Sequence, residues 1–309
     1  MSSSPRLCSL SVDLDEIDSY HAIHGLPPPA PALAHTVYDV ALDRLRSFAA
    51  SASVPLTLFA VGRDLERPEN ATRLHRMRQL GHEIANHSFD HRYDLTRLPG
   101  VEIERQVTLA ADGIQRAVGA RPSGFRAPGY TITDALLSAL QRAGCAYDAS
   151  VFPCPPYYLA KASALGMIAL RGRRSRSVLD HPRVLLAPTR PYRVGNRYHR
   201  RGHGLVELPV QVTPVARLPY IGTTLTLAGP TWARWLTRLL VGEPFVNLEL
   251  HGIDLLDEND GLRMLRSHQP DVRVPLSRKL DVLDAVLSLL RGCGYTFVRM
   301  DEAAERVLP

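Results

Sequence analysis

Residues 7–16, LCSLSVDLDE, decide the fold class, because a mostly apolar run there ends in two acidic side chains. Residues 7–12 predict a buried strand, and Asp13 and Asp15 follow it directly. Alternate residues of an extended segment point the same way, so both carboxylates could face one site. By itself, a pair of this kind is equally compatible with a simple turn at the end of a strand.

Short apolar runs alternate with amphipathic stretches along the rest of the chain. Further strands are expected at residues 55–61, 82–86, 124–126, 146–148, 205–210, 245–251 and 295–300, and helices at residues 36–50, 71–80, 101–118, 133–143, 231–240 and 276–291. Thr133 suits a helix N-cap, and Gly144 lies just past the end of that helix. Strands that alternate with helices predict an α/β protein with a parallel sheet and helices outside, open or closed into a barrel.

The length and composition are those of a globular protein with one large domain. The chain has 309 residues, 45% of them hydrophobic and 22% charged, so residues 1–309 are expected to form a single domain. Two segments interrupt the alternation: residues 153–204 are rich in Pro, Arg and Gly, and residues 213–230 form an apolar stretch broken by Pro and Gly. We expect both to be functional or mobile loops.

The cysteines and the N-terminus favour the cytoplasm. Four cysteines (Cys8, Cys145, Cys154 and Cys293) are scattered without C-x-x-C spacing, which is typical of free thiols. The first seven residues lack the pattern of a signal peptide. No apolar run reaches the roughly 18 residues of a membrane span.

Positive charge is concentrated in one part of the chain. Residues 171–201 hold ten arginines and one acid, Asp180, a net +9, whereas the whole chain carries +6, so the remainder carries −3. A local basic segment favours an anionic ligand or surface, and no nucleic-acid partner is predicted. The alternative is that a high-GC genome has filled a solvated loop with arginine, since 35 of the 37 basic residues are arginine.

The segment NHSFDH at residues 86–91 contains two histidines four residues apart. If the segment turns into a helix, His87 and His91 lie on one face and could share a metal ion. Twelve histidines in 309 residues give about 0.5 such pairs by chance, so the spacing alone proves little. A second pair, His199 and His203, lies in the arginine-rich segment, and we interpret it as surface histidines.

Three more polar groups follow predicted strands. They are Arg126 in FRAPGY, Asp148 in AYDAS and His251, which closes FVNLELH. Each alone is as compatible with a structural role, but in parallel α/β folds catalytic groups gather at the carboxyl ends of strands. One face could therefore collect Asp13, Asp15, His87, His91, Arg126, Asp148 and His251. Two histidines and one carboxylate leave positions open for water and substrate, as catalytic metal sites require.

The order SVDLDE, NHSFDH, FRAPGY, YDAS, LELH resembles the five motifs of the polysaccharide deacetylase (NodB-homology, carbohydrate esterase family four) superfamily. The H-[ST]-x-x-H motif is matched in full by His87, Ser88 and His91. The D-x-D form of the first motif is similar to a cytoplasmic branch of the superfamily that acts on non-polymeric substrates. Two positions depart from the pattern, with Glu249 in place of a leucine and Gly129 in place of a frequent aromatic residue.

The resemblance implies a distorted (β/α) barrel and a metal-dependent deacetylase acting on the N-acyl, in particular N-acetyl, amide of an amino sugar. Asp15, His87 and His91 would hold a divalent metal: zinc, or alternatively cobalt, iron, manganese or nickel. The protein would be cytoplasmic, and its substrate an N-acylated amino sugar.

The same resemblance assigns roles in catalysis. Asp13 would act as the base, oriented by Arg126. His251, helped by Asp148, would protonate the leaving amine. The oxyanion and the substrate would be contacted at Pro128, Gly129 and Tyr130.

The basic segment adds a hypothesis about the substrate. Arg173, Arg174 and Arg176 could bind a phosphate or diphosphate in a nucleotide-linked or polyprenyl-linked sugar. The apolar loop at residues 213–230, followed by Trp232 and Trp235, could touch a lipid tail, which would place the protein peripherally at the inner membrane face.

Two rival interpretations involve other classes of protein. A haloacid-dehalogenase-type phosphatase would use Asp13 as nucleophile and Asp15 as acid, but it leaves the histidines unused and lacks a well-placed lysine. A barrel that binds a glycan or lipid headgroup without turnover is disfavoured, because both acids and three strand-end histidines are present.

Overall fold

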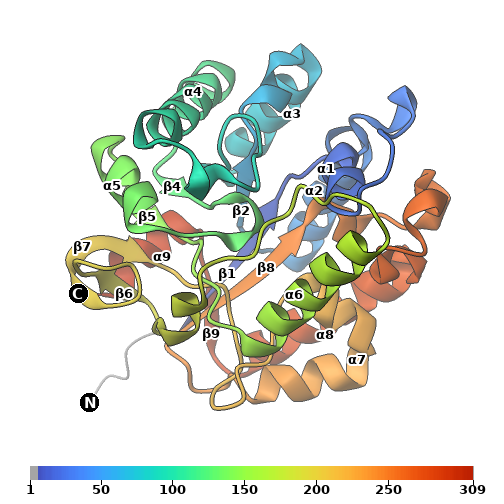
Figure 1. Ribbon diagram of the computed structural model, residues 1–309. Helices are drawn as coiled ribbons and strands as arrows, with labels where there is room; N and C mark the ends of the chain where they lie inside the picture. Colours follow the sequence, from blue (N-terminus) through green and yellow to red (C-terminus); the bar gives the residue numbers. More distant parts are fainter. Residues whose placement is uncertain (1–5, 309) are drawn as a thin grey trace.

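A curled, mostly parallel sheet surrounded by helices forms the computed structural model, which describes residues 6–308 (Figure 1). The strands are β1 (Arg6–Asp13), β2 (Leu56–Ala60), β3 (Glu83–Asn86), β4 (Gly124–Phe125), β5 (Tyr147–Asp148), β6 (Tyr192–Val194), β7 (Arg201–Glu207), β8 (Phe245–His251) and β9 (Tyr295–Phe297). The helices are α1 (Ile17–Ile23), α2 (Leu42–Ala52), α3 (Pro68–Gln79), α4 (Gly100–Val118), α5 (Asp134–Arg142), α6 (Pro155–Leu170), α7 (Gly222–Arg238), α8 (Leu276–Gly292) and α9 (Met300–Arg306). The predicted distorted (β/α) barrel is confirmed.

Strand β1 organises the sheet. The strand order is β6-β7-β5-β4-β3-β2-β1-β8, and β9 pairs with the first half of β1. Every pairing is parallel except that of β6 with β7. A side chain bridges β8 to the segment after β7: the Asn247 amide donates to the carbonyls of Leu208 (3.3 Å) and Pro209 (3.2 Å). It also accepts from the Ser11 hydroxyl on β1 at 3.0 Å. Together with an isolated bridge between Ile221 and Glu249, these side-chain bonds link β8 to the segment after β7, where the described residues form no continuous strand ladder.

The main core lies between the sheet and helices that cover it. Leu10 and Val12 of β1 are fully buried, as expected for a strand covered on both faces. On α8, Leu283, Leu287 and Leu290 recur at intervals of three and four residues and are all buried, so they form one apolar face of the helix. This packing fixes β1 and β8 side by side and so fixes the groups at their carboxyl ends.

Most of the predicted elements are confirmed, and two are wrong. Thr133 caps α5 by accepting from the backbone N–H of Leu136. The segment 153–204, expected to be irregular, contains α6 and β6. Helix α6 is apolar all round and therefore shows no periodicity, and its two N-terminal prolines suit the first turn of a helix. The expected loop at 213–230 instead runs into α7 from Gly222 onward, with a kink at Gly229 and Pro230.

The structure shows the state of the four cysteines and whether any described helix could cross a membrane. Cys8, Cys145, Cys154 and Cys293 are all free. Burial raises the pKa of Cys145 to about 12 and that of Cys154 to about 11, so neither thiol is activated. Between residues 6 and 308, none of the helices is both long and apolar enough to cross a bilayer.

Candidate active site and metal centre

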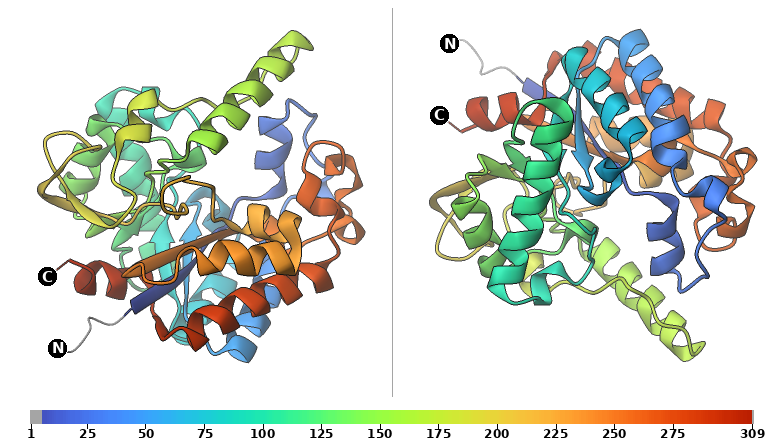
Figure 2. Two further views of the ribbon diagram at one scale, coloured as in Figure 1. Left: turned by 90° about the horizontal axis from the view of Figure 1, so that it is seen from below. Right: turned by 90° about the horizontal axis from the view of Figure 1, so that it is seen from above.

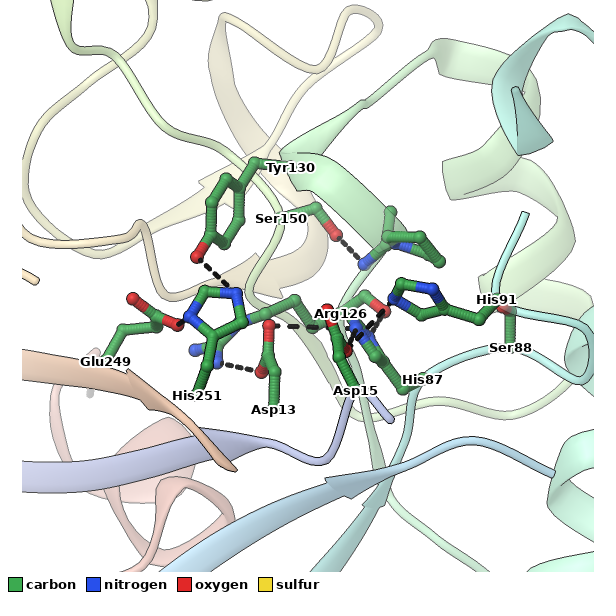
Figure 3. A network of polar contacts seen from close by, with 12 residues as sticks. Asp13, Asp15, His87, Ser88, His91, Arg126, Tyr130, Ser150, Glu249 and His251 are labelled. Atoms are coloured by element: carbon green, nitrogen blue, oxygen red, sulfur yellow. Dashed lines mark hydrogen bonds and ion pairs between the residues drawn. The ribbon is translucent and has the colours of Figure 1, made fainter. Parts of the chain in front are cut away.

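The carboxyl ends of β1, β3, β4 and β8 meet at one edge of the sheet and bring most of the expected groups together (Figure 3). The register of β1 and β8 places Asp13 beside His251 and Ser11 beside Glu249. His87 follows β3, and Arg126 follows β4. The arrangement follows from parallel pairing, which aligns strand ends that lie far apart in sequence.

Asp15, His87 and His91 form a buried cluster with the character of a metal site. The Nε2 atoms of His87 and His91 lie 3.1 Å and 3.0 Å from the same Asp15 oxygen. These three atoms are buried and make no hydrogen bond to any other group in the described part of the chain. Buried polar atoms without partners are costly, so their convergence fits a cation between them.

The far side of each imidazole is held in place. Nδ1 of His87 lies 2.7 Å from the Arg126 carbonyl oxygen, and Nδ1 of His91 lies 3.2 Å from the Ser19 hydroxyl. A donor bond at Nδ1 leaves the Nε2 lone pair free to bind a metal, the arrangement usual around metal-binding histidines. The three residues therefore fit a divalent ion.

A turn brings the two histidines together, and not the helix that their spacing of four residues also allowed. Ser88 and His91 have left-handed backbones, with φ of 65° and 50°. Asn86 accepts from the Ser88 N–H at 2.8 Å, and Gln106 accepts from the Asp90 N–H at 2.9 Å. Strained backbone conformations of this kind persist where surrounding hydrogen bonds hold them, and they are common at functional sites.

Arg126 fixes Asp13 in one orientation. Its guanidinium donates to one Asp13 oxygen at 2.6 Å, to the Ser11 hydroxyl at 2.9 Å and to the Ala149 carbonyl at 3.1 Å. It also lies over the Phe59 ring, 4.2 Å from the centroid. The second Asp13 oxygen is left facing the metal cluster, 3.7 Å from Nε2 of His87.

The partner of His251 is Glu249. Nδ1 of His251 lies 3.0 Å from a Glu249 oxygen, and its Nε2 lies 3.4 Å from the Tyr130 hydroxyl. Burial alone would lower the pKa of His251, but the Glu249 carboxylate raises it well above the ordinary histidine value. Glu249 was noted in the sequence only as a departure from the motif, although residues two apart on a strand share a face.

The expected pairing of Asp148 with His251 is wrong. Asp148 lies on β5, which is not a neighbour of β8, and its strand partner is Glu207. It accepts from the Ser150 hydroxyl at 2.6 Å, and Ser150 in turn accepts from the Ala127 N–H at 2.8 Å. Asp148 therefore supports the backbone of the FRAPGY segment, and Glu249 reaches the imidazole in its place.

A cleft of about 300 Å³ opens above these groups. Its walls include Asp15, His251, Gly129 and Tyr130 together with Tyr20, Tyr93, Tyr157, Lys161, Ser177, Thr223, Thr224 and Gln269. Pro128 and the arginines Arg173, Arg174 and Arg176, all expected to contact substrate, are not among its lining residues. Lys161 is the cleft's one basic side chain of the lysine or arginine type, and no pattern in the sequence marked it.

Comparisons with known proteins concern the sequence of one part of the chain and its fold. Residues 35–147 match the family model described as Polysaccharide deacetylase. Over its fold the chain is similar to a proposed polysaccharide deacetylase from Mycobacterium smegmatis, with 18% identity, 99% of this chain and 94% of that chain covered, and a TM-score of 0.58. It is also similar to a CE4-family pseudoenzyme from Bacillus anthracis, with 13% identity, 97% and 66% coverage, and a TM-score of 0.50. No curated protein matches the chain.

Proposed function

We propose that this chain is a metal-dependent deacetylase of an N-acetylated amino sugar, because residues 35–147 match the polysaccharide deacetylase family model and the fold is similar to that of a structure described as a polysaccharide deacetylase. The observation that carries the proposal is the meeting of Asp15, His87 and His91 with their three ligand atoms free. A fold of this kind does not ensure turnover, because one similar structure is described as a pseudoenzyme. This chain has the side chains that turnover would need, namely Asp13, Asp15, His87, His91 and His251.

Asp15, His87 and His91 would hold the ion, with Asp13 beside them as the base. A divalent cation there would supply Lewis-acid polarisation of the acyl carbonyl and make a water more acidic. Asp13 has one oxygen fixed by Arg126 at 2.6 Å and the other free toward the cluster, so it is positioned to accept a proton from the attacking water.

His251 lies on the opposite side of Asp13 from His87, where it would protonate the leaving amine (Figure 3). Amines leave poorly unless they are protonated, and an imidazolium at Nε2 supplies the proton. The phosphatase alternative receives no support, because the family match and the fold are those of deacetylases.

Acetate release from a panel of N-acetyl amino sugars tests the proposal. The purified protein, loaded separately with zinc, cobalt, nickel, manganese or iron(II), is expected to release acetate from at least one sugar and to stop when a chelator is added. A protein that binds metal stoichiometrically but releases acetate from no member of the panel would contradict it.

The contact between Glu249 and His251 predicts a pH effect. His251 acts in its protonated form, so a raised pKa keeps it active as the pH rises, and activity is lost only above that pKa. Glu249→Gln removes the charge that raises it, so the alkaline limb of the kcat/KM profile should move to lower pH. A bound cation would offset the effect of the nearby Asp15 charge on the pKa of His251, but it would not offset the effect of the direct contact with Glu249. Glu249→Asp keeps the charge, so its alkaline limb should lie between those of the wild type and Glu249→Gln. If the limb lies at the same pH in all three proteins, Glu249 does not set the pKa of His251.

We also propose that the substrate carries a phosphate or diphosphate. Two arginines of the basic segment are already paired, Arg190 with Glu243 and Arg197 with Asp134. By contrast, the segment with Arg173, Arg174 and Arg176 is exposed and passes the cleft rim, where Ser177 lines the cleft. Arginine forks bind phosphate oxygens in pairs, which supports this choice.

Turnover of a free N-acetyl sugar and of its diphosphate-linked form should therefore differ. We expect the linked form to be preferred, and the joint change Arg173→Gln, Arg174→Gln and Arg176→Gln to raise KM for that form alone. A similar triple, Arg190→Gln, Arg193→Gln and Arg197→Gln, is the control. Equal turnover of both forms in all three proteins would contradict the phosphate proposal.

A further inference from the structure

Helix α6 is an apolar helix that the protein does not cover. Its sixteen residues, PPYYLAKASALGMIAL, include no acid and one base, Lys161, yet none of them is buried. Leu159, Met167 and Leu170 are 66%, 52% and 89% exposed. Figure 2 shows the helix extending away from the rest of the molecule. A helix that is apolar on all sides normally lies in a protein core or in lipid, and this one does not lie in the core.

Basic side chains follow α6 directly. Arg171, Arg173, Arg174 and Arg176 are all exposed, and none of them takes part in an ion pair within residues 6–308. From residue 149 to residue 206 the only acid is Asp180. Apolar and basic groups therefore form one continuous surface, residues 159–176, which we name the α6 surface.

The base of α6 belongs to the cleft. Tyr157 and Lys161, in its first two turns, line the cleft, and Lys161 donates to the Gly129 carbonyl at 2.9 Å. Beyond the helix, Ser175 donates to the carbonyl of Ile23 at 2.6 Å, which returns the chain to α1, where Ile23 also lines the cleft. The α6 surface thus begins and ends at the rim of the cleft.

We propose that the α6 surface docks on a lipid bilayer that contains anionic lipids, with the exposed apolar side chains in the acyl boundary and the four arginines at the headgroups. Exposed apolar area and basic charge are the two terms that bind a helix to an anionic interface. Each arginine near such a surface contributes about fivefold to the partition coefficient. If the function proposed above is correct, docking sets the cleft at the interface, where an amino sugar linked to a lipid through phosphate would lie.

This surface replaces the one expected from the sequence. The segment 213–230 does not form one continuous apolar loop, because α7 begins at Gly222 and Leu225 is fully buried, so that Val215 and Leu227 are exposed as separate side chains. Trp232 and Trp235 are 61% and 44% exposed and pack edge to face on α7. Arg234 and Arg238 beside them are exposed and form no ion pair within residues 6–308, but these are two arginines against four after α6, and neither tryptophan lines the cleft.

Vesicle flotation of the full chain tests the docking. Vesicles of phosphatidylcholine alone are compared with vesicles of phosphatidylcholine and phosphatidylglycerol, at low and high salt. We expect binding to the anionic vesicles that weakens with salt, and at least about tenfold weaker binding when Leu159→Glu, Met167→Glu and Leu170→Glu are combined or when Arg171, Arg173, Arg174 and Arg176 are changed to Gln.

The control is Leu80→Glu, Leu239→Glu and Val241→Glu, which adds the same charge at exposed apolar positions just before β3 and β8, at the other end of the strands. This variant should bind vesicles less than about threefold more weakly than wild type, since the affected positions lie away from the interface. Equal binding to both kinds of vesicle, or equal loss in the control, would overturn the proposal. If the protein binds no vesicles but forms a concentration-dependent dimer that the α6 substitutions abolish, the α6 surface docks on a second copy of the chain and the bilayer proposal is overturned.

Turnover separates this proposal from the proposed function. Acetate release from a water-soluble N-acetyl sugar, with no vesicles present, should be unchanged in the variant with Leu159→Glu, Met167→Glu and Leu170→Glu. If the protein binds vesicles but deacetylates no sugar, the docking proposal is supported and the proposed activity is contradicted. If it deacetylates a sugar but binds no vesicles, the activity is supported and the docking proposal is contradicted.

Discussion

His87→Ala is expected to yield a folded protein that retains no stoichiometric metal and shows no acetate release above background. His87 places one of only three ligand atoms in the cluster, 3.1 Å from the Asp15 oxygen, and its other nitrogen is fixed by the Arg126 carbonyl. With two ligands left, a catalytic ion is held poorly, since such sites use three protein ligands. The same result is expected for His91→Ala. Metal content per chain, measured by mass spectrometry after dialysis, gives the answer directly.

The control substitutions use the other histidines four residues apart. His199→Ala and His203→Ala lie outside the clusters that could hold an ion and should keep wild-type metal content. Added metal should raise the melting temperature of the wild type and of these controls, because a ligand that binds only the folded state stabilises it, but not that of His87→Ala. Full occupancy in His87→Ala would remove this histidine from the site.

Much of the site could be predicted from local patterns. Asp13 and Asp15 lie at the end of a strand that its mostly apolar run predicts, and parallel pairing collects strand ends at one edge. The match to a known order of motifs then linked β1, β3, β4 and β8 without knowledge of their register. The conformation of residues 87–91 could not be predicted, because its left-handed residues depend on bonds from Asn86 and Gln106.

The partner of His251 could not be assigned from motif order alone. Asp148 and Glu249 are both acids near strand ends, and only the sheet order shows that β5 is not a neighbour of β8. Helix α6 was not predicted from the sequence for another reason. Sequence periodicity detects helices that have one apolar face, and α6 has no polar face to contrast with it. The turn at residues 87–91 and the partner of His251 depend on tertiary neighbours, and α6 lacks the contrast between an apolar and a polar face on which the prediction of helices relies.

Asp13→Asn is expected to keep the metal and to lose about 10²–10⁴-fold in turnover, because the base is removed while the three ligands remain. Asp15→Asn should instead weaken the metal itself, since the charged oxygen between the two histidines is lost. Metal content and turnover of the two variants, measured on the same preparations, separate the roles. Loss of metal in Asp13→Asn with retention in Asp15→Asn would reverse them.

A stability measurement shows whether the lost turnover of Asp13→Asn reflects chemistry. Asp13 is 2% exposed and Arg126 is fully buried, so Asp13→Asn leaves a buried guanidinium without the negative charge that balances it, even where the Asn amide oxygen still accepts its hydrogen bond. Breaking such a pair costs about 3–5 kcal/mol in the free energy of unfolding, and Glu249 nearby should keep the loss toward the lower value. Adding Arg126→Met to Asp13→Asn removes the unpaired charge and should recover much of that stability in urea titrations. Turnover should not recover with it, because neither side chain can then accept the proton; a double variant that regained activity along with stability would mean that Asp13 serves the fold and not the reaction.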